Sequence, residues 1–475
     1  MGRGAGSVGP PGGTDRRALI RGATVVTASE TYRADVLIAG ERIAAIGADL
    51  ARDGARVVDA GGLHLLPGGI DVHTHLDMPL GDIAASDDFE SGQVAAAFGG
   101  TTSHLDFVIQ PRGASLHEAL DQWHARARDK ACIDYGFHMT ITDPRPEVLD
   151  EVAHLPARGV PTVKVLMAYR GRVMVEDADI LRIMRRAAAA GMLTMVHCEH
   201  GDAIDVLIGD ALAAGRRAPR DHGLTRPAVL EAEATGRAIA LAEVAGAPLY
   251  VVHVTCAGAV AQIRAARARG LPVWGETCPQ YLCFTADDLD RPGFEGAKYV
   301  CSPPLRTVAD QQALWRALRD GALAVVSTDH CPFHFATQKR LGMNDFTKIP
   351  NGLPVIEHRL QVLHHLGVCQ GRVSLNRLVE IGATNPARLF GLYPRKGTIT
   401  VGADADLALW DLGTARTISA HTHHMRVDYS LFEGMTMRGA PVAVWSRGEQ
   451  IVDGAQFVGA RGRGRYLPRA QFSRT

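Results

Sequence analysis

The sequence predicts an α/β protein: a (β/α)8 barrel joined to a small β-sandwich domain that both chain ends build. Three observations support this prediction. Short apolar runs alternate with helical stretches through the middle of the chain, these runs number eight, and β-rich segments with glycine turns flank them on both sides. Eight β/α units in succession are typical of a barrel of roughly 250 residues or more.

The flanking β-rich segments are expected at 18–67 and 391–455. The first contains ALIRGATVVTA and YRADVLIAG, and the second contains APVAVWSRGEQIVDG, each bounded by turn residues. Because the ends of a domain commonly lie close together at its surface, both segments are expected to form one sandwich. Residues 1–17 have no apolar secretion segment and are predicted to be a disordered leader, and 456–475 are predicted to be a C-terminal tail.

The barrel is predicted to occupy residues 68–390. We place its strands at GIDVHTH (69–75), TSHLDFV (102–108), YGFHMTI (135–141), TVKVLMAY (162–169), LTMVHCE (193–199), LYVVHVT (249–255), PVWGETC (272–278) and ALAVVSTD (322–329). Helical patterns lie between them, for example at 177–190, 227–245 and 258–269. In this fold the chemistry takes place at the C-terminal ends of the strands.

Composition argues against several classes of partner. Lysine plus arginine and aspartate plus glutamate both number 51, so the chain lacks the basic character of a nucleic-acid binder or a polybasic membrane anchor. The uncharged stretch 244–263 is long enough for a membrane span, but Pro248 and His253 within it argue against one. Eight cysteines without a CxxC pair favour the reducing cytoplasm. The expected partner is a small molecule or a second copy of the chain.

Residues with metal-ligand chemistry stand at or near the ends of five predicted strands. They are His73 and His75 on the first strand, Lys164 on the fourth, His197 on the fifth, His253 on the sixth and Asp329 on the eighth. Because His73 and His75 are two residues apart on a strand, their imidazoles share a face and can reach one ion. Taken alone, the pair His73 and His75 is equally compatible with an ordinary core or surface role, and a lone buried histidine such as His197 or His253 is more often a hydrogen-bonded core residue. Their convergence at one barrel mouth favours a metal site.

Lys164 is an unusual residue for such a place, because its ammonium would lie among metal cations. Burial and nearby positive charge lower the pKa of a lysine, and the neutral amine can capture CO2. The resulting carbamate is an anion that can bridge two metals. The alternative is an ordinary lysine that is ion-paired with Glu276 or Asp106, and the residues alone leave both readings open.

Longer motifs resemble the hydantoinase and dihydropyrimidinase family of the amidohydrolase superfamily, above all bacterial D-hydantoinases. These motifs are GGIDVHTHLDMP (68–79), SDDFESGQVAAAFGGTT (86–102), TVKVLMAY (162–169), GETCPQYL (275–282), CSPPLR (301–306), STDHCPF (327–333), IPNG (349–352) and, near the C-terminus, THHMRVDYSLFEG. They follow in order over nearly the whole chain, and matches of this length are highly specific.

The resemblance implies two divalent metal ions, usually Zn2+, and a homotetramer. One ion would be held by His73, His75, Asp329 and the carboxylated Lys164 (N6-carboxylysine), and the other by the same carbamate with His197 and His253. It also implies catalytic roles for Asp329, which would transfer the proton, and Tyr169, which would polarise the scissile carbonyl. Main-chain groups at Ser302 and Asn351 would bind a cyclic ureide. From the residues alone, Tyr169 is equally compatible with a structural role.

The implied reaction opens the cyclic amide of dihydropyrimidines or 5-substituted hydantoins to N-carbamoyl amino acids. Asp77 stands where dihydroorotase-like enzymes use an arginine, which argues against an acidic ring. An allantoinase-like enzyme is the nearer alternative, and a non-catalytic scaffold relative is disfavoured because every metal-ligand position is filled. The gate around the ring substituent is expected to contain Met78, Leu80, Leu166 and Val173, so we predict an aliphatic, open pocket.

Overall fold

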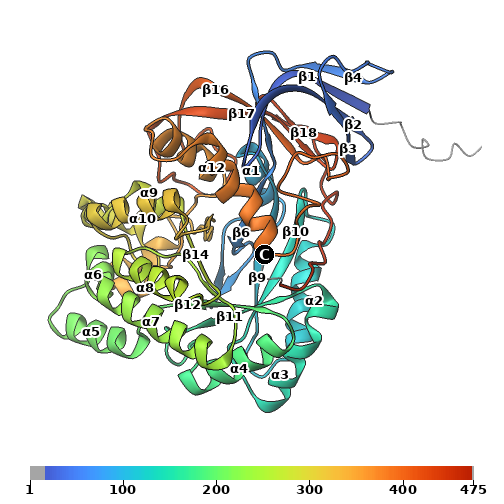
Figure 1. Ribbon diagram of the computed structural model, residues 1–475. Coiled ribbons are helices and arrows are strands. Elements are labelled where there is room, and N and C mark those ends of the chain that lie inside the picture. The colour runs from blue at the N-terminus through green and yellow to red at the C-terminus, as the bar shows by residue number, and fades with distance from the viewer. Residues whose placement is uncertain (1–16, 473–475) are drawn as a thin grey trace, which may run out of the picture.

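The computed structural model describes residues 17–472 and divides them between a parallel barrel and a mostly antiparallel sheet (Figure 1). Residues 1–16 of the predicted leader lie outside the described residues. Arg17, which the prediction placed at the end of that leader, is instead the first residue of strand β1 (Arg17–Val26). The prediction of an α/β barrel joined to a β-domain from both chain ends is confirmed.

Eight parallel strands form the barrel in the order in which they follow along the chain. They are β6 (Gly69–Thr74), β9 (Thr101–Ile109), β10 (Asp134–Thr140), β11 (Thr162–Leu166), β12 (Leu193–His197), β13 (Leu249–Val251), β14 (Val273–Thr277) and β15 (Val325–Val326). Each overlaps one of the predicted apolar runs. Parallel strands covered on both faces are apolar along their whole length, which is why the sequence shows them as continuous runs.

Backbone hydrogen bonds just beyond β15 close the barrel between its first and last strands. The amide of Asp329 donates to the carbonyl of His73, and the amide of His75 donates to the carbonyl of His330, both at 2.9 Å. A parallel bridge joins Thr74 to His330. The bonds that complete the barrel therefore also place Asp329 beside the two histidines of β6.

Helices surround the barrel on its outside (Figure 1). Those between the barrel strands are α1 (Ser91–Phe98), α2 (Leu116–Ala127), α3 (Pro146–Glu151), α4 (Asp177–Ala189), α5 (Gly201–Ala213), α6 (Pro219–Leu224), α7 (Ala228–Ala245), α8 (Ala257–Ala268), α9 (Pro279–Cys283) and α10 (Val308–Asp320). After β15 come α11 (Arg359–Val362), α12 (Leu375–Val379) and α13 (Asn385–Leu389). Local sequence explains several ends: Ser115 and Glu118 form a capping box at the start of α2, and Gly321 ends α10 with a φ of 86°.

The last part of the chain closes the floor of the barrel, at the N-terminal ends of the strands. The amide of Leu467 donates to the carbonyl of Tyr135 at 2.7 Å. The buried guanidinium of Arg469 donates to the carbonyl of Phe137 and, at 2.8 Å, to the hydroxyl of Thr162. The segment that was predicted as a tail thus supplies packing and hydrogen bonds to β10 and β11.

A nine-stranded sheet joins the two ends of the chain. From the N-terminal part it contains β1, β2 (Thr31–Ala39), β3 (Arg42–Gly47), β4 (Arg56–Asp59) and β5 (His64–Pro67), and from the C-terminal part β16 (Leu407–Thr417), β17 (Thr436–Ser446), β18 (Glu449–Asp453) and β19 (Gln456–Phe457). The junction is the antiparallel pair β5–β16, in which Leu65 faces Leu409. The strands are thus hydrogen-bonded into a single sheet. Apolar side chains of this sheet pack into a hydrophobic cluster that is separate from the barrel core.

Within residues 17–472, no helix combines the length and the apolar character that a membrane crossing requires. The uncharged stretch 244–263 contains the end of α7, the barrel strand β13 and the first part of α8. The stretch 244–263 is therefore apolar because it forms part of the buried barrel wall.

Candidate metal centre and substrate cavity

The six predicted metal-ligand residues meet at the C-terminal mouth of the barrel. His73 and Lys164 lie within β6 and β11, and His197 is the last residue of β12. The other three follow their strands closely: His75 after β6, His253 after β13 and Asp329 after β15. The parallel barrel brings together residues that are up to 256 positions apart in the sequence, because all its strands end on the same side.

Asp329 and the two histidines of β6 form the first half of the centre. The Oδ1 atom of Asp329 lies 3.1 Å from Nε2 of His73 and 3.1 Å from Nε2 of His75. Burial lowers the pKa of His75 to about 4, although Asp329 opposes this shift. Against the effect of burial, charge and hydrogen bonds from the two neighbouring histidines, His73 above all, keep the pKa of Asp329 well below its usual value. An ionised carboxylate beside a neutral imidazole is the protonation state that binds metals.

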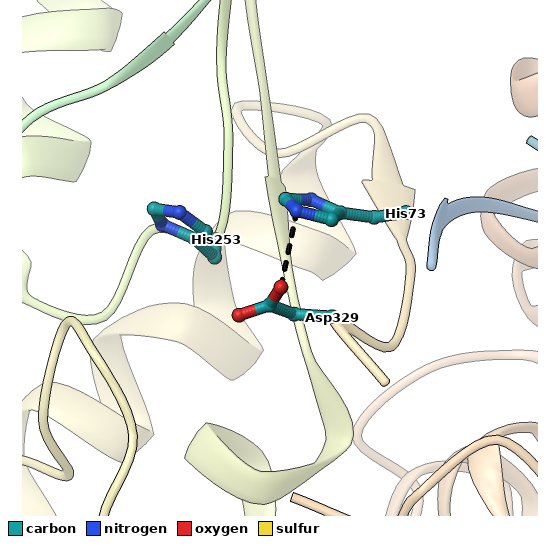
Figure 2. Close-up of side chains that lie close together, drawn as sticks. All are labelled: His73, His253 and Asp329. Carbon is teal, nitrogen blue, oxygen red and sulfur yellow. Dashed lines mark ion pairs between the residues drawn. The ribbon is translucent and has the colours of Figure 1, made fainter. Parts of the chain in front are cut away.

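His197 and His253 form the second half of the centre. Nδ1 of His197 faces Nε2 of His253 at 2.9 Å. Burial holds the pKa of His253 well below its usual value, and the electrostatic effect of the neighbouring His197 adds to this. Figure 2 shows His253 and His73 on opposite sides of the Asp329 carboxylate, with the His73 ion pair marked. The ligand atoms of these three residues all lie within 4.8 Å of one another.

Lys164 lies beside the first half of the centre. Its Nζ is 3.1 Å from Nε2 of His73 and 3.9 Å from the centre of the Phe107 ring. The suggested ion pairs with Glu276 or Asp106 are not formed: Glu276 contacts His73, and Asp106 accepts hydrogen bonds from Thr74, Leu76 and Trp123. Burial lowers the pKa of Lys164 to about 8, although Asp329 and Glu276 oppose this shift. About a tenth of the amine is therefore neutral at pH 7, far more than for an ordinary lysine.

Two buried glutamates orient the histidines, and the sequence analysis did not identify either one as functional. Glu276 in β14 contacts Nδ1 of His73 at 2.5 Å through Oε1, and Glu199 contacts Nε2 of His197 at 2.9 Å. A carboxylate accepts only, so each glutamate fixes the proton on the outer nitrogen and leaves the inner nitrogen free to bind an ion. A local signal existed: Glu199 follows His197 by two residues on the same strand end.

These donors fit a divalent metal centre. Two ligands bound to one ion at about 2.1 Å in tetrahedral geometry lie roughly 3.4 Å apart, close to the 2.9–3.1 Å that separates neighbouring donors here. Among the described residues, Nδ1 of His75 and Nδ1 of His253 are buried without a hydrogen-bond partner. Imidazole nitrogens together with one carboxylate are donor types that Zn2+ prefers.

Several residues of the centre adopt strained backbone conformations. Tyr169, His253 and Asp329 have positive φ angles of 69°, 37° and 54°. Residues other than glycine rarely adopt such angles, and each costs on the order of 1–3 kcal/mol. The surrounding fold therefore holds these three side chains in place at the expense of local backbone energy.

A cavity of about 640 Å3 opens above the centre. Besides five of the six ligand residues, all but His73, three residues with expected substrate roles line it, namely Tyr169, Ser302 and Asn351. The Asn351 amide donates to the Ser302 hydroxyl at 3.0 Å, which links the two segments. Burial raises the pKa of Tyr169 to about 12, with a further contribution from Glu199, so its hydroxyl stays protonated and can donate.

The outer wall of this cavity is mainly aliphatic. Met78, Leu80, Leu166 and Val173 all line it, as the sequence analysis expected. Ile83, Ile109, Leu341 and Ile349 add further aliphatic surface. Among the described residues, Tyr169 is the only one with a phenyl ring on the cavity lining. The wall can therefore accommodate apolar substituents by burying their surface.

Comparison with known proteins places the chain in a family. A family model described as the amidohydrolase family matches residues 64–451. The chain is 53% identical to a D-hydantoinase of Streptomyces coelicolor, over 96% of this chain and 98% of that protein. It is 52% identical to a D-hydantoinase of Geobacillus stearothermophilus, over 96% and 97%.

The chain belongs to the hydantoinase and dihydropyrimidinase branch of the amidohydrolase family. The crystal structure of a dihydropyrimidinase from Brevibacillus agri NCHU1002 superposes on this amidohydrolase with a TM-score of 0.96. Sequence identity to it is 53%, with 97% of this chain and all of that chain covered. These comparisons confirm the resemblance seen in the sequence motifs. In this amidohydrolase, catalysis is expected at the mouth of the barrel.

Proposed function

We propose that this protein is a metal-dependent hydrolase that opens the ring of cyclic ureides, namely hydantoins with a substituent at position 5 and dihydropyrimidines. The observation that carries the proposal is the set of six convergent donors at the base of the aliphatic cavity. The D-hydantoinases that share about half of its residues over nearly their whole length support it. The product would be an N-carbamoyl amino acid.

Two divalent ions, zinc by preference, would be held by the six donors. His73, His75 and Asp329 would bind the first ion, and His197 and His253 the second. When bound, such ions polarise a carbonyl and lower the pKa of water to about 7. The ligand atoms are preorganised by Glu276 and Glu199, which hold the histidine protons on the outer nitrogens.

Lys164 would complete both sites as N6-carboxylysine. The ammonium first loses one proton; the neutral amine then attacks CO2, forms a carbon–nitrogen bond and releases a second proton, so that a cation becomes a carbamate anion with two oxygens. The lowered pKa of Lys164 and, among the described residues, the lack of an ion pair between Lys164 and a carboxylate support this step. The anion would offset positive charge that the ammonium would otherwise increase.

The residues of this chain would divide the proton transfers and the substrate contacts. The ionised carboxylate of Asp329 would accept a proton from the attacking water and return it to the leaving ring nitrogen. The protonated hydroxyl of Tyr169 would donate to the carbonyl oxygen as negative charge develops there. Main-chain groups of Ser302 and Asn351 would bind the ureide and orient it.

The ring substituent would lie against Met78, Leu80 and Leu166, and this aliphatic wall favours bulky apolar groups. We further propose a homotetramer that works in the cytoplasm, in keeping with eight cysteines that are all free thiols. The domain division of the chain at residues 67 and 390 also remains our proposal.

The direct test is to purify the protein, determine its metal content per chain and assay dihydrouracil, a series of 5-substituted hydantoins and allantoin. We expect close to two divalent ions per chain and turnover of hydantoins. Active enzyme with less than one ion per chain would contradict the binuclear site. Turnover of dihydrouracil without any hydantoin that carries a bulky substituent would contradict the proposed pocket, and preference for allantoin would favour the alternative reaction.

Replacement of Lys164 by alanine tests the carbamate. We expect loss of metal and activity, both partly restored by millimolar short carboxylic acids that can occupy the place of the carbamate. Lys298→Ala is the matched control, because Lys298 pairs with Glu295 and lies over the Phe335 ring without lining the cavity. A Lys164→Ala enzyme with full activity would rule out the bridging role.

A further inference from the structure

Lys339 is a fully buried lysine that none of the proposed catalytic steps uses. It begins the 3₁₀ helix η5 (Lys339–Gly342) and has no solvent exposure. Its Nζ donates to three backbone carbonyls, those of Val300 at 3.1 Å, Pro350 at 2.7 Å and Gly352 at 2.9 Å. The three donors of an ammonium are therefore matched by three carbonyl acceptors.

These carbonyls belong to two segments at the lining of the cavity. Val300 directly precedes Cys301 and Ser302, and Pro350 and Gly352 flank Asn351, and all but Val300 line the cavity. Two further links join the segments: the Gly352 amide donates to the Val300 carbonyl at 3.1 Å, and the Asn351 side chain donates to Ser302. Of these links, only the Lys339 side chain bonds to the backbone of both segments, 300–302 and 350–352.

The same contacts extend to the segment that carries Asp329. The amide of Cys331, two residues after Asp329, donates to the carbonyl of Leu353 at 3.2 Å. A Cβ atom at Gly352 would lie 2.2 Å from the Cys331 carbonyl oxygen, so the two backbones approach as closely as glycine permits. The position of residues 350–352 is thus fixed relative to Asp329 as well as to Ser302.

Burial of an ammonium group at this position costs free energy. Among the described residues, no carboxylate pairs with Lys339, and burial lowers the pKa of its amine to about 7, with only weak opposition from Cys301 and Cys331. A buried charge without a counter-ion persists only where its hydrogen bonds are complete. The presence of a buried lysine here therefore indicates that the three carbonyls of Val300, Pro350 and Gly352 require a side chain with three hydrogen-bond donors.

We propose that Lys339 is a positioning residue for substrate binding: it holds the backbones of 300–302 and 350–352 so that the ureide ring lies at the correct place relative to Asp329. This inference rests on the proposed function, in which those backbones bind the ring. Lys339 touches none of the metal-ligand residues, so its effect falls on substrate placement rather than on metal content.

A second buried lysine provides a matched control. Lys396 is also almost fully buried, and its Nζ contacts the carboxylates of Asp134, Asp404 and Asp406 at 2.9, 3.2 and 2.5 Å. These aspartates lie at the junction of the barrel floor and the nine-stranded sheet, and none of them lines the cavity. Loss of Lys396 removes a buried three-contact lysine without touching the substrate segments.

The experiment compares Lys339→Met with Lys396→Met and the unchanged protein. For each we would determine Tm, metal per chain, kcat and KM on one 5-substituted hydantoin. We expect Lys339→Met to keep its metal and to raise KM at least about 10-fold, because a misplacement on the order of 1 Å costs up to about 100-fold in rate. Lys396→Met is expected to lower Tm while KM stays within about twofold.

A lower Tm with unchanged KM in Lys339→Met would overturn the proposal, since the residue would then be structural only. If that variant does not fold, Lys339→Arg and Lys339→Gln carry the test. Arginine keeps the charge and the donors and is expected to keep KM nearer to that of the unchanged protein than glutamine, which is shorter and has two donors. Equal KM values in both would overturn the proposal. Failure of the unchanged protein to hydrolyse any ureide would instead overturn the proposed function.

Discussion

Replacement of Glu276 by glutamine tests how the protein prepares His73 to bind metal. In the structure, Oε1 of Glu276 contacts Nδ1 of His73 at 2.5 Å, and Oε2 accepts the Tyr250 hydroxyl at 2.9 Å. The carboxylate requires the His73 proton on Nδ1, which leaves Nε2 free to face Asp329 and Lys164. A glutamine keeps the shape of the side chain but offers one acceptor and one NH2 donor.

The magnitude follows from the two ways in which the amide can sit. If its NH2 faces His73, the proton moves to Nε2 and the metal-binding lone pair is lost. If its oxygen faces His73, the correct tautomer remains, but a buried bond to a charged acceptor is lost, worth about 1.5–3 kcal/mol. At about 1.4 kcal/mol per tenfold, that is roughly 10- to 100-fold in metal affinity.

The assay is metal content per chain after dialysis against increasing concentrations of a chelator, together with Tm and activity. Glu276→Gln is expected to lose metal at a chelator concentration about 10- to 100-fold lower than the unchanged protein. Glu357→Gln is the matched control, because Glu357 pairs with His424 at 2.9 Å outside the cavity. Equal metal retention in Glu276→Gln and the unchanged protein would refute the reasoning about the His73 proton.

Two further predictions concern substrate range and stability. Leu166→Trp should lower kcat/KM for hydantoins with bulky 5-substituents at least about 10-fold, because the tryptophan narrows the cavity at its aliphatic wall. The kcat/KM for dihydrouracil should change little. An equal loss for both substrates would argue against that wall as the substituent site. Asp88→Asn should lower stability by about 1 kcal/mol above pH 4, after allowance for solvent screening. Despite partial burial, the Ser91 amide and Arg426 lower the pKa of Asp88 to about 2, so the stability it contributes is present above its unfolded value near 3.8 and is lost as pH falls toward 2. Thermal melts between pH 3 and 6 should therefore show a Tm difference that shrinks on acidification, and a constant difference would contradict this assignment.

Much of the fold could be predicted because buried parallel strands are apolar along their length and end on one side of the barrel. Strand β13 illustrates this: it is only three residues long, yet LYVVHVT marks it clearly and places His253 just beyond its end. The convergence of His73, His197, His253 and Asp329 follows from topology alone, since each stands at or just beyond a strand end.

Other features depend on contacts that have no local signal. Glu276 lies on a predicted strand, but its choice of His73 and Tyr250 over Lys164 depends on side-chain directions across the barrel. Lys339 follows no recognisable pattern, because its partners are backbone carbonyls of distant segments. The union of the terminal strands into a single sheet depends on the β5–β16 pair, which composition does not reveal.

That pairing has a consequence for how the chain matures during translation. Strand β5 can pair with β16, and Tyr135 can bond to Leu467, only after the later partner has been synthesised. Hundreds of residues separate the two partners in each case. At about 5–20 residues per second, the N-terminal strands leave the ribosome on the order of 20–70 s before their partner is made. During that time they present an unpaired edge of the kind that invites aggregation. The yield of native protein thus depends on how well the cell shields the nascent chain until its last residues emerge.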